Sequence, residues 1–207
     1  MRQAVLHAPG DLRIEDVPWP VAEDSGDVLI RVEAALLCGT DVRIYDGTKS
    51  RNVTLPSVLG HEFAGRIIEA NEPLPAGLAI DTQVCVYPLV PCGQCVACRK
   101  GHENICRERV AFGYQLAGGL SQVIRVPAKA VPNLVPLQGV PATSAAIVEP
   151  AACAYNGQKL VRSRDAETML VTGCGPLGLL HIRLAKALGI PRVAAVDPIE
   201  ARRRMAT

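Results

Sequence analysis

Residues 168–197 read TMLVTGCGPLGLLHIRLAKALGIPRVAAVD and hold two apolar runs of strand length, with a glycine-rich turn and a helical stretch between them. The turn is a GxGxxG pattern that begins at Gly173 and ends at Gly178. The stretch after it carries leucines at helical spacing, which predict an apolar helix face. Gly189 and Pro191 predict the end of that helix. The leucines are Leu177, Leu180, Leu184 and Leu188. Together these elements predict a βαβ unit with parallel strands.

The spacing of the glycines favours a dinucleotide-binding turn. Gly173 and Gly175 permit a tight turn and a close approach of the backbone to a pyrophosphate, and Gly178 lets the helix pack closely on the strand. Pro176 and Leu177 would form the first helical turn, where unpaired backbone N–H groups face negative charge. We therefore expect these five residues to contact a dinucleotide cofactor.

An acidic residue ends the second apolar run. Asp197 follows Gly178 by nineteen positions, where dinucleotide-binding units place an acid on the adenosine ribose. Its carboxylate would accept hydrogen bonds from both ribose hydroxyls and repel a 2′-phosphate, which favours NAD over NADP. The alternative is that Asp197 only caps the next helix, ahead of Pro198. Cys174 is interpreted as a small residue that faces the turn.

A second motif is PCGQCVACRKGHENIC, residues 91–106. Its cysteines read CxxCxxC followed by seven residues and a fourth Cys, so one compact loop can direct four sulfurs at one centre. Four thiolates suit tetrahedral zinc and leave it no open position, which predicts a structural zinc. The alternatives are an iron–sulfur cluster, whose ferredoxin pattern closes after three residues with Cys-Pro, and disulfides or free thiols. The predicted zinc ligands are Cys92, Cys95, Cys98 and Cys106.

Composition narrows the classes of function. The chain has 207 residues, 49% of them hydrophobic, which is enough for one or two globular domains. The net charge of +2 and the lack of long basic runs argue against nucleic-acid and membrane-surface partners. The N-terminal stretch lacks the apolar core of a secretory signal, and no stretch has the length of a membrane span. We therefore expect a cytoplasmic protein, in which CxxC spacing favours metal or redox chemistry over disulfides.

The pattern of elements changes near residue 150. Up to about Val135, short Val- and Ile-rich runs separated by Gly, Pro, Asp and Asn predict a β-rich domain. The Ala-rich stretch 142–161 then looks helical, with Pro150 at the start of a helix or at a kink. We expect a β-rich domain over residues 1–150 and a partial dinucleotide-binding domain over residues 151–207.

Two further stretches complete a family resemblance. Residues 37–47 read LCGTDVRIYDG and residues 59–65 read LGHEFAG, and both are similar to signatures of the zinc-dependent medium-chain alcohol and polyol dehydrogenases. The four-cysteine loop and the GxGxxG unit follow in that family's order, so the resemblance covers the whole chain. It implies a β-rich GroES-like catalytic domain followed by a truncated α/β Rossmann cofactor domain. The chain resembles most the branch of the sorbitol (L-iditol) and L-threonine dehydrogenases.

The resemblance also implies a catalytic zinc in the cleft between the two domains. Cys38 and His61 match its ligands, and Glu62 matches either a third ligand or a carboxylate that exchanges with water. The remaining family position, a cysteine in the liver-type enzymes, matches Glu149 here. Such a set leaves one open position, as a Lewis-acid site requires. Taken alone, each of these residues is more often structural. Cys153, one helical turn after Glu149, reads as an alternative ligand or, more simply, as a core residue.

The resemblance assigns roles to three neighbours of Cys38. Thr40 matches the hydroxyl that passes the alcohol's proton outward, and Asp41 matches the carboxylate that accepts the other ring N–H of His61. Many relatives continue the proton relay with a histidine, but Arg43 stands at that position and cannot lose a proton near neutral pH. Arg43 could instead attract the anionic cofactor or a phosphorylated substrate. The implied reaction is hydride transfer from a secondary, polyol-type alcohol to NAD, with two Zn²⁺ ions per chain.

The chain ends at Thr207, just after its first βαβ unit, whereas the resembled family continues through further strands. A parallel sheet of two strands cannot cover both of its faces. The alternative to the enzyme is therefore a catalytically inactive fragment that keeps the structural zinc and serves as a binding or assembly module. For the full-length form the resemblance implies a small alcohol as substrate and a homo-oligomer.

Overall fold

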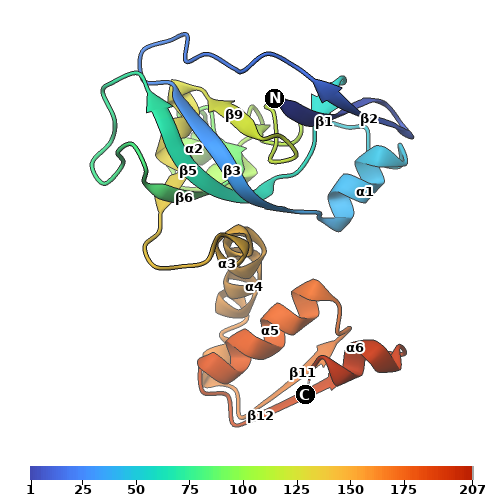
Figure 1. Ribbon diagram of the computed structural model, residues 1–207. Coiled ribbons are helices and arrows are strands. Elements are labelled where there is room, and N and C mark those ends of the chain that lie inside the picture. The colour runs from blue at the N-terminus through green and yellow to red at the C-terminus, as the bar shows by residue number, and fades with distance from the viewer. Residues whose placement is uncertain (207) are drawn as a thin grey trace. The chain divides into compact units, whose positions relative to one another are not determined.

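The structure is a computed structural model that describes residues 1–206. It contains two compact units, Met1–Ile147 and Val148–Thr207. The first unit is rich in strands, whereas the second consists of helices and one pair of strands (Figure 1). Because the border lies just before the helix that contains Glu149, this residue belongs to the second unit.

A five-stranded antiparallel sheet forms the largest part of the first unit. Across the sheet the strands are β10 (Leu134–Pro136), β6 (Gln83–Val86), β5 (Glu62–Ala70), β3 (Val28–Leu36) and β9 (Val123–Val126). Strands β3 and β5 pair along their whole length, and Leu36 at the end of β3 lies opposite Glu62 at the start of β5. Four of these strands, all but β10, coincide with the Val- and Ile-rich runs of the sequence.

The core of the first unit lies against this sheet. Apolar residues two positions apart point to the same side of a strand, as Val28 and Ile30 do in β3, and both are fully buried. From β5, Phe63 packs against Phe112 with ring centroids 5.8 Å apart and an interplanar angle of 77°. Burial of a side chain of this size stabilises the fold by roughly 2 kcal/mol. Cys85, in β6, is also buried.

Smaller elements complete the first unit and position its loops. Helix α1 (Gly39–Tyr45) follows β3 and lies near β1 and β2 in Figure 1. A three-stranded sheet has the order β2 (Asp11–Asp16), β1 (Arg2–Ala8), β4 (Ser57–Val58), and β7 (Leu89–Val90) pairs with β8 (Val110–Ala111). The remaining helical segments are α2 (Val96–Arg99), α3 (Ala142–Ala146) and the 3-10 helices η1 (Glu103–Ile105) and η2 (Ala128–Asn133).

The second unit contains the predicted βαβ unit. Strands β11 (Thr168–Thr172) and β12 (Arg192–Val196) are parallel, and α5 (Pro176–Ala187) connects them. A Cβ added to Gly178 would lie 1.9 Å from the carbonyl oxygen of Gly173, so only glycine allows this close contact. The other elements are α4 (Val148–Leu160), the 3-10 helix η3 (Ser163–Asp165) and α6 (Glu200–Arg204). Pro150 lies in the first turn of α4, as its side chain requires.

The helix face predicted from the leucines is wrong in part. Leu177 is 49% exposed, whereas Ile182 and Ala185 are the buried residues of α5. Cys174 does not simply face the turn either, because it is 1% exposed and packs in the core of the second unit with Ile182. The leucine spacing identifies the helix correctly, but which of its sides is buried depends on where β11 and β12 lie.

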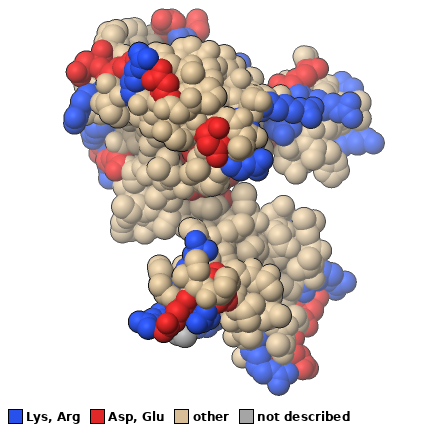
Figure 2. Space-filling model, turned by 90° about the vertical axis from the view of Figure 1, so that its right-hand side faces the viewer, with Lys and Arg blue, Asp and Glu red and all other residues tan. Residues whose placement is uncertain are grey.

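Helix length and the distribution of surface charge are relevant to the expectation that the chain has no membrane or nucleic-acid partner. Among residues 1–206, no helix is long and apolar enough to cross a membrane. On the face shown in Figure 2, basic and acidic side chains occur mostly in small groups separated by uncharged surface.

Candidate metal centres and cofactor turn

Three potential metal ligands from two separate segments meet in the first unit. Cys38 is the N-cap residue of α1, and Glu62 begins β5 directly after His61. One ligand atom from each of these three residues lies within 4.8 Å of the other two. His61 and Glu62 are buried, whereas Cys38 is partly exposed. The structure therefore brings together residues that the sequence drew from two separate motifs.

Asp41 joins the two segments that carry these ligands. One of its carboxylate oxygens, Oδ2, accepts the backbone N–H of Cys38 at 2.9 Å, and the other, Oδ1, accepts the N–H of Gly60 at 3.2 Å. Oδ1 also lies 3.4 Å from Nδ1 of His61. Burial would raise the pKa of Asp41, but hydrogen bonding and attraction from His61, together with the two N–H groups, lower it below its usual value. Asp41 is therefore a buried carboxylate that stays ionised.

The turn before His61 is held by close backbone packing. Gly60 has a φ of +89°, and its carbonyl accepts the N–H of Gly119 at 2.7 Å. A Cβ on Gly118 would lie 2.3 Å from the Gly60 oxygen and 2.4 Å from the Leu59 oxygen. Only glycine at position 118 allows this loop to lie directly against the backbone of Leu59 and Gly60. This contact fixes the direction of the chain just before His61.

The electrostatic surroundings of Cys38 favour a bound cation. Burial raises the pKa of the Cys38 thiol, hydrogen bonds from the backbone and side chain of Thr40 oppose this, and the Glu62 carboxylate raises it further. A thiolate and a carboxylate this close repel one another, and a divalent cation between them reverses the effect. One sulfur, one imidazole nitrogen and one carboxylate form a donor set that zinc binds. The residues present thus fit a zinc ion.

An aromatic side chain and a lysine adjoin this centre, and neither was predicted from the sequence. The ring of Tyr114 lies 5.7 Å from the imidazole of His61, tilted by 56°. The ammonium group of Lys49 lies 5.1 Å from the centroid of the Tyr114 ring. No short motif contains these residues, because loops far apart in the sequence bring them together.

Glu149, the fourth expected ligand, lies in the first turn of α4 in the second unit. Its Oε1 accepts a hydrogen bond from Sγ of Cys153 at 3.6 Å, which the spacing of one helical turn allows. Cys153 is exposed, so its interpretation as a core residue is wrong.

The four-cysteine loop gathers its sulfurs as its spacing predicts. Helix α2 begins after Cys95 and places Cys98 one turn later, while η1 ends just before Cys106. Sγ of Cys98 lies 3.9 Å from Sγ of Cys92 and 3.4 Å from Sγ of Cys95, which itself lies 3.8 Å from Sγ of Cys106. None of these sulfurs is in a disulfide.

These separations fit a single zinc ion. Zinc–sulfur bonds of about 2.3 Å in a tetrahedron place the sulfurs about 3.8 Å apart. In an iron–sulfur cluster the four sulfurs surround several irons and bridging sulfides, so they lie farther apart. A hydrogen bond from the Cys98 backbone lowers the pKa of the Cys95 thiol to about 7, whereas burial raises the pKa of Cys98 to about 12. Four thiolates this close repel one another, and a cation between them would let all four ionise.

The glycine turn of the second unit is closed by Asp197. Gly173 has a φ of +93°, and its N–H donates to the carbonyl of Val196 at 2.7 Å. Asp197 is buried, and its carboxylate accepts the N–H of Cys174 at 2.8 Å and that of Ile199 at 2.8 Å. These two N–H groups lower the pKa of Asp197. The carboxylate therefore fastens the glycine turn to the end of β12 and holds the turn before α6. Asp197 is not the helix cap that the alternative interpretation expected, because the N-cap residue of α6 is Ile199 and no side chain of residues 1–206 caps this helix.

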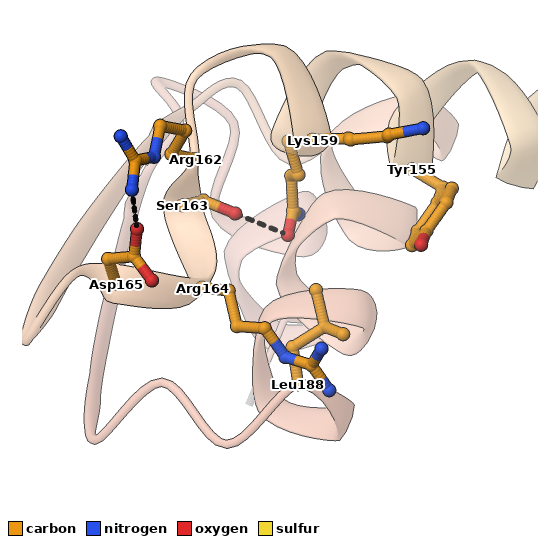
Figure 3. Close-up of a pocket in the computed structure, with 8 residues that line it drawn as sticks. Tyr155, Lys159, Arg162, Ser163, Arg164, Asp165 and Leu188 are labelled. Carbon is orange, nitrogen blue, oxygen red and sulfur yellow. Dashed lines mark hydrogen bonds and ion pairs between the residues drawn. The ribbon is translucent and has the colours of Figure 1, made fainter.

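A cavity of about 240 Å³ in the second unit contains none of these residues. It lies beside the last turn of α4 and includes Arg162, which pairs with Asp165 at 3.2 Å (Figure 3). Ser163 donates to Oε1 of the buried Gln158 at 3.2 Å, and Gln158 in turn donates to the carbonyl of His181 at 2.9 Å. These bonds hold η3 against α4 and α5. The cavity is therefore formed by the packing of these three elements, and we assign no ligand to it.

A known protein family matches most of the first unit. The sequence profile of the alcohol dehydrogenase GroES-like domain matches residues 24–138. The chain belongs to the zinc-dependent medium-chain alcohol dehydrogenase family. Within this family it is 35% identical to L-threonine 3-dehydrogenase of Pyrococcus abyssi over 193 residues, which are 92% of this chain and 53% of that protein.

Two solved structures of this family resemble the chain over nearly all its length. Galactitol-1-phosphate dehydrogenase from Escherichia coli has a TM-score of 0.90 and 26% identity, and the match covers 100% of this chain and 58% of that one. A zinc-binding dehydrogenase from Sinorhizobium meliloti 1021, bound to NADP, has a TM-score of 0.90 and 30% identity, covering 99% and 58%. The chain thus spans little more than half the length of its relatives. The family resemblance and the GroES-like fold predicted from the sequence are confirmed.

Proposed function

We propose that this chain carries the metal centre and the first part of the cofactor site of a dehydrogenase that oxidises a secondary, polyol-type alcohol with NAD. In the overall reaction the alcohol carbon gives a hydride to NAD⁺ and the hydroxyl loses a proton, so the products are a ketone, NADH and H⁺. The observation that carries the proposal is the grouping of one ligand atom each from Cys38, His61 and Glu62 within 4.8 Å.

We infer that these three residues hold the catalytic zinc, with Glu149 as a further ligand. A zinc ion held there supplies a Lewis acid that makes an alcohol hydroxyl more acidic. Asp41 lies on the Nδ1 side of His61, which leaves Nε2, 4.0 Å from Oε1 of Glu62, to face the metal. Because Asp41 also holds the backbone at Cys38, one carboxylate fixes the directions of two ligands.

Thr40 is proposed to take the proton of the alcohol. Thr40 lies in the first turn of α1. Burial raises the pKa of the Cys38 thiol, and the backbone N–H and hydroxyl of Thr40 lower it. Arg43 is exposed one turn further along α1 and cannot accept a proton. The proton therefore leaves through water or through the nicotinamide ribose.

The second zinc is proposed to be structural and to bind Cys92, Cys95, Cys98 and Cys106. The loop holds only short elements, α2 and η1, which are too short to be stable by themselves. A closed tetrahedral ion would supply the missing stabilisation without taking part in the reaction.

The βαβ unit is proposed to begin a Rossmann domain that starts near residue 150 and binds NAD. Gly173, Gly175 and Gly178 would form the pyrophosphate turn, and Pro176 and Leu177 begin the helix that points its N–H groups at the phosphates. Asp197 would turn its carboxylate to the adenosine ribose. This requires Asp197 to exchange at least one of its hydrogen bonds with Cys174 and Ile199 for ribose hydroxyls.

The first test is the zinc content of the purified protein after loosely bound metal has been removed. Two zincs per chain are expected, with one lost in the Cys38→Ser variant and the other lost in Cys98→Ser. Cys85→Ser serves as the control, because Cys85 is a core residue outside both clusters.

The same preparations are then assayed for reduction of NAD by secondary alcohols. Activity that falls with Cys38→Ser supports the dehydrogenase. One zinc that only Cys98→Ser removes, with no affinity for NAD in calorimetry, would instead indicate a binding or assembly module.

A further inference from the structure

Lys49 places a positive charge beside Tyr114, the ring that adjoins His61 of the proposed catalytic centre. The lysine is partly buried, and its ammonium lies 5.1 Å from the centroid of the Tyr114 ring. The Tyr114 ring in turn lies 5.7 Å from the imidazole of His61. A ring and a cation at these distances attract one another, so Tyr114 orients the ammonium without neutralising it.

The loop after α1 holds Lys49 in this place. The N–H of Lys49 donates to the carbonyl of Arg43 at 2.8 Å, so the chain folds back on the end of α1. Thr48 donates to the Asp46 carboxylate through its N–H at 2.8 Å and through its hydroxyl at 2.6 Å. Tyr114 is fixed as well, because its carbonyl accepts the N–H of Thr54 at 3.1 Å. The position of the ammonium is therefore fixed by two hydrogen-bonded segments, the loop after α1 and the segment that contains Tyr114.

Neither cation here has a fixed counterion within the described residues. Within residues 1–206, no carboxylate lies within ion-pair distance of Lys49 or Arg43, although most other arginines of the first unit's sheets are paired. The nearby Asp46 is already engaged by Thr48, whose hydrogen bonds lower its pKa first, with a smaller contribution from the charge of Arg43. Two positive charges, one on α1 and one on the loop that follows it, thus remain available to a negatively charged ligand.

We propose that Lys49, together with Arg43, recognises an anionic group of the substrate, and that the preferred substrate is a secondary alcohol carrying a phosphate ester or a carboxylate. This inference rests on the proposed function, because it places the alcohol at the Cys38, His61 and Glu62 centre. A charge-assisted hydrogen bond from a partly buried ammonium is stronger than one to a neutral hydroxyl. A phosphate dianion gains more than a carboxylate, and a neutral polyol gains least.

The test compares three ligands that share one six-carbon chain: sorbitol 6-phosphate, gluconate and sorbitol. In calorimetry on the zinc-loaded protein, the Kd of the phosphate ester is expected to be lower than that of sorbitol by a factor of about ten or more. The Kd of gluconate should lie between the two. Lys49→Met should remove most of this preference, and Lys49→Arg should keep it. Lys186→Met, an exposed lysine of α5, is the matched control.

The outcomes separate this inference from the proposed function. Equal binding of all three ligands, or a preference that survives Lys49→Met, would overturn the inference even if the protein reduces NAD. A fall in NAD affinity with unchanged sugar preference would overturn it too, since the lysine would then serve the cofactor. Because binding is measured directly, a preference lost in Lys49→Met supports the inference even where no alcohol is oxidised.

Discussion

Asp41 hydrogen-bonds to both chain segments of the proposed catalytic centre, and its replacement tests that role. Asp41→Asn keeps the shape but turns one acceptor oxygen into a donor and removes the charge that faces His61. We expect zinc affinity at this centre to fall about 10- to 100-fold. Competition with a coloured chelator measures this affinity.

The control for this variant is Asp46→Asn, because Asp46 is exposed and its carboxylate accepts hydrogen bonds from Thr48 of the neighbouring loop. The four-cysteine zinc should be retained in both variants. Equal loss of both zincs in Asp41→Asn would show that the substitution unfolds the first unit rather than loosening one centre.

Asp27 makes stability depend on pH. Its carboxylate is fully buried and accepts the N–H groups of Asp24 and Ala128 and the guanidinium of Arg125. Burial raises its pKa, but these N–H groups and Arg125 outweigh burial and lower it below 3.8. Because the folded pKa lies below the unfolded one, the stabilisation is complete above about pH 4 and is lost as the pH falls through the folded pKa.

Urea unfolding at pH 7 and at pH 3 checks this expectation. Asp27→Asn should lower the free energy of unfolding by about 2 kcal/mol at pH 7, and the difference from the parent should shrink at pH 3. Asp11→Asn, which breaks an exposed pair with Arg13, should change little. A difference that does not depend on pH would mean that Asp27 acts through its shape alone.

Individual site residues could be predicted from the sequence only where they belong to a recognisable motif. Cys38, His61 and Glu62 stand in two short signatures, so their approach could be expected before the structure was known. Lys49 and Tyr114 could not, because their contact depends on two loops that no local pattern relates. Asp197 was identified, but its hydrogen bond to Cys174 depends on how tightly β12 lies beside the glycine turn.

At the scale of elements, two glycines of the turn have different roles: Gly178 allows the helix to pack on the strand, and Gly175 is proposed to approach the pyrophosphate. Gly178→Ala would place a Cβ 1.9 Å from the Gly173 oxygen, so the turn or the helix must shift. We expect a loss of about 2 kcal/mol from this overpacking. Gly175→Ala meets nothing within 4 Å and has a φ of −70°, so the fold should tolerate it.

Thermal unfolding and calorimetry with NAD check the two variants together. If the backbone at Gly175 approaches a pyrophosphate, Gly175→Ala weakens NAD binding without lowering the melting temperature. Unchanged NAD affinity in Gly175→Ala would argue against a pyrophosphate at this turn. An unchanged melting temperature in Gly178→Ala would contradict the packing role.

Strand patterns were easier to predict than helix faces. The main strands β3 and β5 combine apolar runs with flanking turn residues, and both runs are strands in the structure. In α5 the leucines suggested one face, but Ile182 and Ala185 are buried instead, while Leu177 is exposed. An apolar helix surrounded by further apolar residues can turn either side inward, and the sheet beside it decides which.

For the whole molecule, both groups of metal ligands with gathered side chains belong to the first unit, and the glycine turn belongs to the second. Apart from Glu149, the ligand proposed from the second unit, metal and cofactor should therefore bind to different parts of the chain. Any ligand that binds only the folded state adds stability, about 2.7 kcal/mol at a concentration of 100 Kd. Removing zinc should lower the melting temperature of the first unit, and NAD should raise that of the second.

The single tryptophan makes the two responses separable, because Trp19 lies in the first unit. Its fluorescence follows the first unit, while far-ultraviolet circular dichroism includes the helices of the second. A strong chelator should move the fluorescence transition to lower temperature. NAD should move only the transition of the second unit's helices, which circular dichroism detects, to higher temperature. If the chelator moves both signals by the same amount, the units unfold as one, and the metal then stabilises the cofactor turn as well.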